Sequence, residues 1–474
     1  MIFHSLDFLA FFVVVVSLYW TLPLREQNVL LLVASYAFYG WVQPWWTVLL
    51  FATTFIDYWA ARNMTDHPAY RKRWLWLSLI ANPGLLGVYK YFNFFVENVA
   101  AAGAALGWTV PEIALRVALP AGISFYTFQS MSYTIDVYRG HAPARSRFID
   151  VAAFVSFFPH LVAGPIMRAT NLLPQFERPR VFSPAAARDA AMLIVWGLFK
   201  KLVIADNVGI IANKVFSLEA PEFFVLWAGV FAFAIQIYAD FSAYTDIARG
   251  VAKWFGFDLI TNFARPYLAT GPGDFWRRWN ISLSTWFRDY VYIPLGGSRC
   301  PPWQQGVNLL VTFVASGLWH GASWNYVLWG AYHGVLLVLG RVAGSTRAQA
   351  PAWLRPLRIA GMFVLTLVGW LIFRETELSQ LTRHVQLRPW QSSELGRSAG
   401  LYLFLLVGVY SIPLWIHDLW AELRLPDLSA AIDAPEPALH WRRVAMQAAL
   451  CGVMMIAIVT LRSQTALDFI YFAF

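Results

Sequence analysis

The sequence predicts an all-α protein with many transmembrane helices, and three observations carry that prediction. Of its 474 residues 58% are hydrophobic and only 13% are charged, which is roughly half the charge of a soluble domain. Aromatic residues make up 17% of the chain, and many lie at the ends of apolar runs, where membrane–water interfaces favour them. The mean hydropathy is +0.51. These values exclude a soluble enzyme, a disordered protein and a secreted disulfide scaffold.

Successive apolar runs mark the candidate membrane spans, and a straight crossing needs about 20 residues. The runs cover residues 8–24, 29–42, 46–59, 74–91, 119–137, 151–164, 191–204, 223–238, 307–318, 327–339, 359–373, 401–416 and 444–461. Several are too short to cross directly, so we expect about ten to twelve full crossings together with re-entrant segments. Proline and glycine interrupt many runs, and irregular backbone at membrane depth is tolerated where it lines a cavity.

The charged residues indicate topology rather than nucleic-acid binding. The net charge is +9, but the basic residues are scattered between apolar runs, where they set orientation and contact anionic lipid headgroups. Four basic residues follow the third candidate span and three follow the fifth, whereas the loop 99–118 carries only Arg116. The positive-inside rule therefore predicts that the N-terminus lies outside the cytoplasm. Cys300 and Cys451 lie too far apart in sequence for a disulfide framework or a zinc motif, so we expect no metal.

Two stretches interrupt the apolar pattern within what we expect to be a single integral-membrane domain, residues 1–474. In residues 270–301, large apolar side chains recur every three or four residues and predict one amphipathic helix. Arg277, Arg278 and Arg288 flank that apolar face, which is typical of a helix lying at the membrane interface. Residues 375–400 are expected to form a polar loop.

The run 234–246 carries ionisable groups inside an apolar segment, which makes it a candidate functional site. On a helix, Gln236, Asp240 and Tyr244 share one face, while Asp246 lies about 240° around the axis from Asp240. The two carboxylates are therefore no acid–base pair. Two interpretations stay open: a polar wall that shapes a catalytic chamber, or an interhelical hydrogen-bond cluster without chemistry.

Two histidines, His320 and His333, lie in a Trp-rich apolar segment. Thirteen residues of continuous helix separate the two rings by about 20 Å and about 220°, so the spacing argues against a shared metal ion. A single buried imidazole suits general base catalysis. The alternative is a packed histidine bonded to a backbone carbonyl, and it weighs more for His333. No phosphate-binding glycine loop or nucleophile elbow is present.

Many ordered blocks resemble the membrane-bound O-acyltransferase (MBOAT) family, in particular its bacterial branch of alginate O-acetyltransferases and D-alanyl-transfer relatives. The blocks are LVASYAFY at 32–39, YKYFN at 89–93, LPAGISFY at 119–126, IDVYRG at 135–140, FPHLVAGP at 158–165, DFSAYTD at 240–246, the segment 275–297, LWHG at 318–321 and FIYFAF at 469–474. They cover nearly the whole chain.

The resemblance implies a ring of helices around a central tunnel in the bacterial inner membrane, with an intramembrane histidine at its middle that maps to His320. A second family position, commonly His in alginate-type members and Asn or Asp in other branches, is Asn280 here. The implied reaction moves an acetyl group from a cytoplasmic donor, acetyl-CoA, to an exported polysaccharide such as alginate, with no tightly bound cofactor. Alginate-type relatives work with a periplasmic SGNH-type partner.

We therefore expect His320 to act as general base and Asn280 as an amide donor to the thioester carbonyl or its oxyanion. Arg277, Arg278 and the pair Lys200–Lys201 are candidates for the donor's phosphates, and snorkelling to headgroups is their alternative. Further expected substrate contacts are Trp276, Trp319, Asp240 and Tyr244. Two rival functions stay open, a carrier or flippase without bond-making chemistry and a lipid O-acyltransferase with a long-chain donor.

Overall fold

The structure is a computed structural model that describes residues 1–108, 119–344, 351–424, 441–465 and 467–470. Within these residues every regular element is helical, as the sequence predicts. The chain forms two compact units: unit 1 is Met1–Ala191 with Ile247–Leu259, and unit 2 is Met192–Asp246 with Ile260–Phe474. Arg116 and the end of the block 469–474 lie outside the described residues. The single domain over 1–474 stays a prediction.

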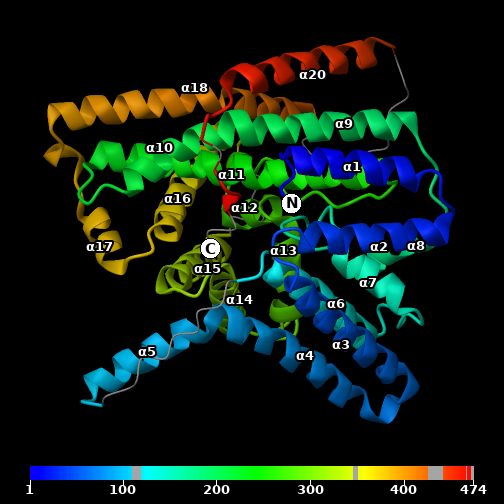
Figure 1. Cartoon of the computed structure of the whole chain (residues 1–474). Coiled ribbons are helices and arrows are strands. Elements are labelled where there is room, and N and C mark those ends of the chain that lie inside the picture. Colours follow the sequence, from blue (N-terminus) through cyan, green and yellow to red (C-terminus); the bar gives the residue numbers. More distant parts are fainter. Residues whose placement is uncertain (109–118, 345–350, 425–440, 466, 471–474) are drawn as a thin grey trace. The chain divides into compact units, whose positions relative to one another are not determined.

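Unit 1 is built from the first helices of the chain (Figure 1). These are α1 (Leu6–Tyr19), α2 (Leu24–Gly40), α3 (Trp46–Asp66), α4 (Arg71–Leu86), α5 (Phe92–Ala105), α6 (Ile123–Arg139), α7 (Phe148–Ser156), α8 (Ala169–Glu177) and the start of α9 (Pro184–Phe199). A π-helical turn, Gly87–Tyr91, joins α4 to α5. The expected span 151–164 is shorter as a helix, because α7 ends at Ser156 and the chain turns before Pro159.

Polar contacts and one glycine fix the packing inside unit 1. The helices α3, α4 and α6 pack against one another, and the buried Asn82 of α4 donates to both carboxylate oxygens of Asp57 of α3 at 3.1 and 3.0 Å. Gly122 precedes α6 with a φ of 75°, and a methyl group there would lie 2.9 Å from the Cα of Val162. The left-handed backbone and the lack of space both require glycine at this position.

Unit 2 contains the remaining helices. They are the π-helical turn Lys200–Ala205, α10 (Asp206–Phe216), most of α11 (Phe223–Trp254), α12 (Pro272–Arg278), α13 (Ile281–Phe287), the π-helical turn Arg288–Tyr292, α14 (Pro302–His320), α15 (Trp324–Val342), α16 (Arg355–Arg374), α17 (Leu378–Gln386), α18 (Glu394–Arg424) and α20 (Trp441–Leu461). Residues 375–400 are therefore no simple loop. They contain α17, a 3-10 turn at Pro389–Gln391 and the start of α18, because Leu381 gives α17 an apolar face that it buries.

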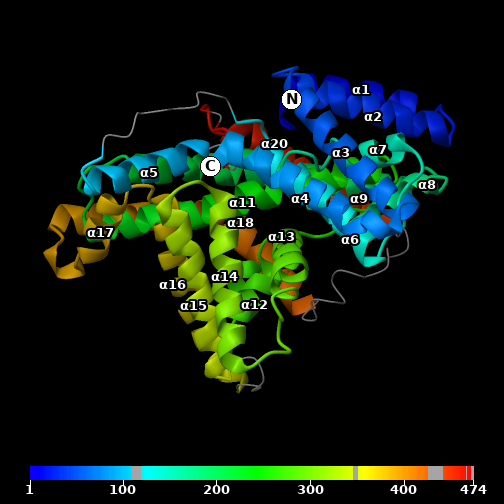
Figure 2. The ribbon, with the colours of Figure 1, turned by 90° about the horizontal axis from the view of Figure 1, so that it is seen from below.

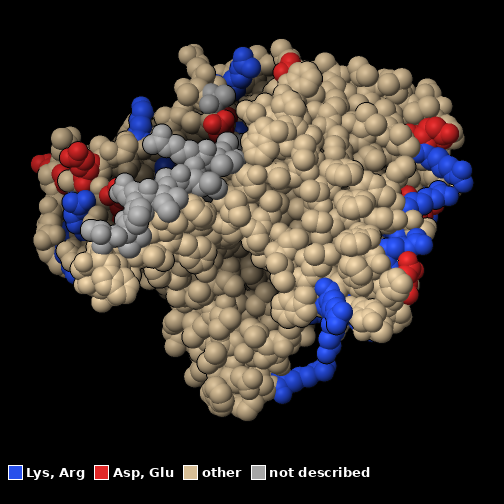
Figure 3. All heavy atoms as spheres, turned by 60° about the horizontal axis from the view of Figure 1, so that its bottom comes forward, with Lys and Arg blue, Asp and Glu red and all other residues tan. Residues whose placement is uncertain are grey.

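Four helices among the described residues are long and apolar enough to cross a membrane: α11, α16, α18 and the Val444–Leu461 part of α20. The most apolar window of α11 is 72% buried, whereas that of α20 is only 11% buried, so α20 has an apolar surface suited to lipid. On the face shown in Figure 3, uncharged residues cover most of the surface and charged side chains gather toward its margins. The chain is thus an all-α integral membrane protein, and the helix ring with its tunnel stays a prediction.

Candidate active site

A tight helical hairpin, α14 and α15, carries both histidines of the Trp-rich segment (Figure 2). The helix α14 ends at His320, Gly321 is fully extended, and α15 begins at Trp324. The two helices approach closely because Gly317 and Gly330 lack side chains. A methyl group on either glycine would collide with a backbone carbonyl of the opposite helix. Small residues at such contacts are typical of membrane proteins.

Aromatic rings surround the imidazole of His320, whose residue is 4% exposed. The ring centroids of Trp319 and Trp329 each lie 5.0 Å from the imidazole, and that of Phe373 lies 5.3 Å away. The space beside Gly321 is filled by the ring of Tyr326, with which a methyl group at Gly321 would collide. His320 thus lies in a compact apolar site from which bulk water is excluded.

The expectation that His333 lies about 20 Å from His320 is wrong. It assumed one continuous helix, whereas the chain reverses direction between α14 and α15. Both imidazoles contact the same indole, because the ring centroid of His333 lies 4.9 Å from that of Trp329. His333 also contacts Trp276 at 5.1 Å. The two histidines therefore belong to one aromatic cluster.

Asn280 lies at a break in the expected amphipathic helix of residues 270–301. In place of one helix the structure has α12 and α13, separated by an extended Trp279 and a left-handed Asn280 with a φ of 41°. Asn280 is 1% exposed, and neither atom of its side-chain amide has a hydrogen-bond partner within the described part of the chain. A left-handed non-glycine residue costs about 1–3 kcal/mol, and an unsatisfied buried amide costs about as much again. Such strain is typical of functional sites.

A chain of aromatic contacts connects the Asn280 turn to His320. Trp279, the residue before Asn280, packs against Trp370 with 4.8 Å between ring centroids. Trp370 in turn stacks on Trp329 at 6.4 Å, and Trp329 contacts both histidines. The imidazole of His320 and the ring of Trp279, which precedes the strained Asn280, thus belong to one aromatic cluster formed by α12, α14, α15 and α16.

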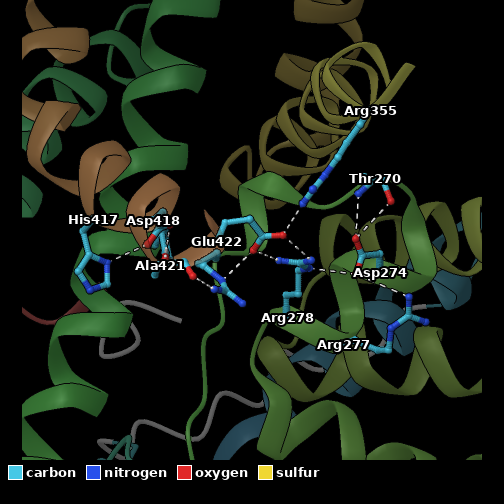
Figure 4. A network of polar contacts seen from close by, with 11 residues as sticks. Thr270, Asp274, Arg277, Arg278, Arg355, His417, Asp418, Ala421 and Glu422 are labelled. Carbon is cyan, nitrogen blue, oxygen red and sulfur yellow. Dashed lines mark hydrogen bonds and ion pairs between the residues drawn. The ribbon is translucent and has the colours of Figure 1, made fainter. Parts of the chain in front are cut away.

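The two arginines of α12 differ in their surroundings (Figure 4). The side chain of Arg278 is 9% exposed and binds Asp274 at 3.0 Å and Glu422 of α18 at 3.0 Å. The side chain of Arg277 is 64% exposed and lies 3.6 Å from Asp274. Burial raises the pKa of Asp274, but the charge of Arg278 and a hydrogen bond from Thr270 outweigh it and hold that pKa below its ordinary value. Of the two arginines, Arg277 is the one open to a ligand.

The polar face of α11 forms ion pairs with the π-helical turn Lys200–Ala205. Asp240 lies 3.1 Å from Lys201 and accepts a hydrogen bond of 2.8 Å from the backbone N–H of Ile470. Lys201 also binds Asp206 at 2.9 Å. Asp240 therefore anchors the C-terminal segment, and these contacts favour the hydrogen-bond cluster over the catalytic wall.

Most of the other residues expected to contact the donor or substrate also have partners within the protein. Lys200 is buried and lies 2.7 Å from Asp246, so neither lysine of the pair Lys200–Lys201 presents an uncompensated charge to a phosphate. The ring of Tyr244 packs on Phe469 at 4.7 Å. Trp276 and Trp319, by contrast, belong to the aromatic cluster around the histidines.

Sequence reasoning missed the residues that connect the predicted ones. Trp329, Trp370 and Phe373 are ordinary aromatic residues of apolar helices, and nothing in their local pattern marks them. Glu422 offered one signal, an acidic residue at the end of a long apolar run, but its partner Arg278 lies 144 positions earlier in the chain. Among the described residues no cluster of histidine, cysteine or acidic side chains has the geometry of a metal site.

Comparison with known proteins identifies the family to which this chain belongs. The sequence profile of the membrane-bound O-acyltransferase family matches residues 31–376, which include the Asn280 turn and the α14–α15 hairpin. The chain belongs to this family, and it is accordingly an O-acyltransferase.

Three bacterial proteins illustrate the similarity. The chain is 38% identical to a probable alginate O-acetylase of Pseudomonas putida, with both chains covered completely. It is 40% identical to a probable alginate O-acetylase of Pseudomonas aeruginosa over 87% of this chain and 80% of that protein. It is also 34% identical to a peptidoglycan O-acetyltransferase of Helicobacter pylori over 85% of this chain and 81% of that protein.

Proposed function

We propose that this chain takes an acetyl group from acetyl-CoA on the cytoplasmic side of a bacterial inner membrane for the O-acetylation of an exported polysaccharide such as alginate. The observation that carries the proposal is the left-handed turn at Asn280: its buried amide has no hydrogen-bond partner among the described residues, and the preceding Trp279 belongs to the same aromatic cluster as the buried imidazole of His320. The similarity to alginate and peptidoglycan O-acetylating proteins supports the choice of polymer.

In this proposal His320 acts as general base on the acceptor hydroxyl. As the hydroxyl oxygen attacks the thioester carbonyl, its proton passes to the imidazole, and a carbon–oxygen bond forms. The carbon–sulfur bond then breaks, and the imidazolium returns the proton to the departing thiolate. The amide N–H of Asn280 donates to the oxyanion, and its rigid turn keeps that donor in place before the reaction starts.

The donor's phosphates would bind at the exposed side chain of Arg277. Guanidinium groups form bidentate hydrogen bonds with phosphate, and the half-exposed Arg355 lies in the same cluster of charges (Figure 4). We assign no phosphate contact to Arg278, because Glu422 and Asp274 already bind it. We assign none to Lys200 or Lys201, because Asp246 and Asp206 already bind them.

Two further parts of the proposal concern the membrane and its far side. We place the N-terminus in the periplasm, as the basic loops predict, so reporter fusions at Asp66 and Arg145 should both report a cytoplasmic location. A periplasmic SGNH-type protein would pass the acetyl group to the polymer. Full-rate acetylation of polymer by the purified chain alone would contradict that requirement.

The decisive experiment is single-turnover transfer from labelled acetyl-CoA by the purified protein in proteoliposomes. We expect transfer of label to an acceptor hydroxyl with acetyl-CoA and none with a long-chain acyl-CoA. A preference for the long-chain donor would favour the lipid O-acyltransferase. Movement of label across the bilayer without release of free CoA would favour the carrier.

A further inference from the structure

One carboxylate, that of Glu422 near the end of α18, forms ion pairs with Arg265, Arg278 and Arg355. Figure 4 shows Glu422 with Arg278 and Arg355. We propose that Glu422 is a positioning residue that holds the Asn280 turn in the conformation used for catalysis. The inference rests on the proposed role of Asn280 and adds a residue that lies outside the family's matched range, residues 31–376.

Backbone hydrogen bonds first define the turn. The N–H of Ala264 donates to the carbonyl of Arg278 at 2.9 Å, and the N–H of Ile281 donates to the carbonyl of Asn262 at 2.9 Å. The side chain of Asn262 also accepts from the N–H of Ser282 at 3.0 Å. The segments 262–264 and 278–282 are thereby paired, and the pairing encloses Trp279 and Asn280.

Glu422 binds both segments of this pairing. Its carboxylate accepts from Nη1 and Nη2 of Arg278 at 3.0 and 3.3 Å, which is the two-point geometry that fixes a guanidinium most firmly. The same carboxylate lies 2.9 Å from Nε of Arg265, the residue after Ala264. Glu422 therefore ties together the two backbone segments that flank the turn.

The distribution of backbone strain points to the same role. Among the described residues, Arg265 and Asn280 are the only non-glycine residues with a left-handed backbone, at φ values of 54° and 41°. Glu422 binds Arg265 directly. It also binds Arg278, which lies two residues before Asn280. Strained conformations persist only where the surroundings over-determine them, and here one buried carboxylate contacts both strained segments.

The charges make this contact hard to replace. Arg265, Arg278 and Arg355 all approach Glu422, which is 7% exposed. Loss of the negative charge removes the carboxylate that the buried guanidinium groups of Arg265 and Arg278 share at 2.9 and 3.0 Å, and the two groups would then separate or take up water. We expect the pairing between residues 262–264 and 278–282 to loosen, so that the amide of Asn280 moves away from the reacting carbonyl.

The test is a double-mutant cycle between Glu422→Gln and Asn280→Gly, read as single-turnover transfer from labelled acetyl-CoA by the full chain. Glutamine keeps the shape of the side chain and one acceptor, and glycine removes the amide while accepting the left-handed φ. We expect Glu422→Gln alone to lower the rate constant roughly 100-fold, the order of loss expected for a small misplacement in an active site. In the Asn280→Gly background we expect it to lower the rate less than threefold.

Glu222→Gln is the matched control. Glu222 anchors the opposite end of α18 by accepting from the N–H and hydroxyl of Ser393 at 2.6 and 2.7 Å, so it reports what a loosened α18 does by itself. We expect its effect on the rate to be small and equal in both backgrounds. An equal loss from Glu422→Gln in both backgrounds, or a loss matched by Glu222→Gln, would overturn the inference. Full activity in Asn280→Gly alone would instead overturn the amide's role and the inference with it.

Discussion

The Asn280 turn and the polar face of α11 both bury polar side chains, yet they do so in opposite ways. On α11, Asp240 has an ion pair with Lys201 and a hydrogen bond from the backbone of Ile470. In the turn, the amide of Asn280 has no hydrogen-bond partner among the described residues, and its backbone is strained. A satisfied polar group stabilises its surroundings. An unsatisfied one costs stability, so it calls for an explanation such as a bound ligand, an ordered water or a part in the reaction.

Substitution of His320, in the aromatic cluster next to the Asn280 turn, should cause the largest loss of acetyl transfer. His320→Ala should abolish acetyl transfer, because a general base contributes about 10²–10⁴-fold to a rate. His320→Gln should be nearly as inactive, since an amide cannot take up the proton. Single-turnover transfer measures both variants, and thermal melting in detergent serves as the folding control.

His333→Ala provides the internal comparison for His320. It removes the other imidazole that packs on Trp329, so it reports the cost of disturbing the cluster without removing the proposed base. We expect a clearly smaller loss than in His320→Ala. Near-normal transfer by a folded His320→Ala protein would contradict the general base mechanism.

Asn280→Gly should cause the second-largest loss of acetyl transfer. It should do so without loss of stability, unlike the substitution of Asp240 on α11. Loss of one oxyanion donor lowers a catalytic rate by about 10²–10³-fold. The same change relieves backbone strain, so we expect the melting temperature to stay equal or rise. A fall in melting temperature with unchanged transfer would assign the turn a purely structural role.

Arg277→Ala should have a moderate effect that is confined to the donor. A charge-assisted hydrogen bond contributes about 1.5–3 kcal/mol, so we expect the KM for acetyl-CoA to rise roughly tenfold or more with an unchanged rate at saturation. Arg288→Ala is the matched control, because its side chain is 59% exposed against 64% for Arg277. An unchanged KM in Arg277→Ala would leave contact with lipid headgroups as its role.

Asp240→Asn should change transfer least and stability most. Lys201 keeps Asp206 as a partner, so we expect the free energy of unfolding to fall by about 1–3 kcal/mol, the cost of a weakened buried polar contact. Transfer per folded molecule should change less than in Asn280→Gly. If turnover falls a hundredfold while melting is unchanged, Asp240 belongs to the catalytic chamber instead.

The sequence predicted elements well wherever a local pattern determines them. The apolar run 223–238 and the polar run after it form one helix, α11, with Asp240 on its buried face. The runs 307–318 and 327–339 are α14 and α15. These features follow from the repeat of apolar side chains, which each residue's neighbours along the chain already specify.

The predictions failed where a helix stops or where partners come from distant segments. The aromatic spacing of residues 270–301 fits one helix, but pairing with residues 262–264 breaks it at Asn280. The separation of His320 from His333 was overestimated because the reversal at Gly321 depends on the ring of Tyr326 and on the close contact of α14 with α15. In both cases packing contacts outweigh the helical preference of the local sequence.

By itself the sequence determined that this protein is an all-α membrane protein, which residues repeat at helical spacing, and which rare polar groups lie within apolar segments. Composition and periodicity suffice for this, because lipid forces the backbone to satisfy its own hydrogen bonds in helices. Only the tertiary structure decided which polar groups are neutralised and which are strained. Asp240 meets Lys201 and Glu422 meets Arg265 and Arg278 through folding alone, since ion pairs between distant residues leave no trace in local spacing.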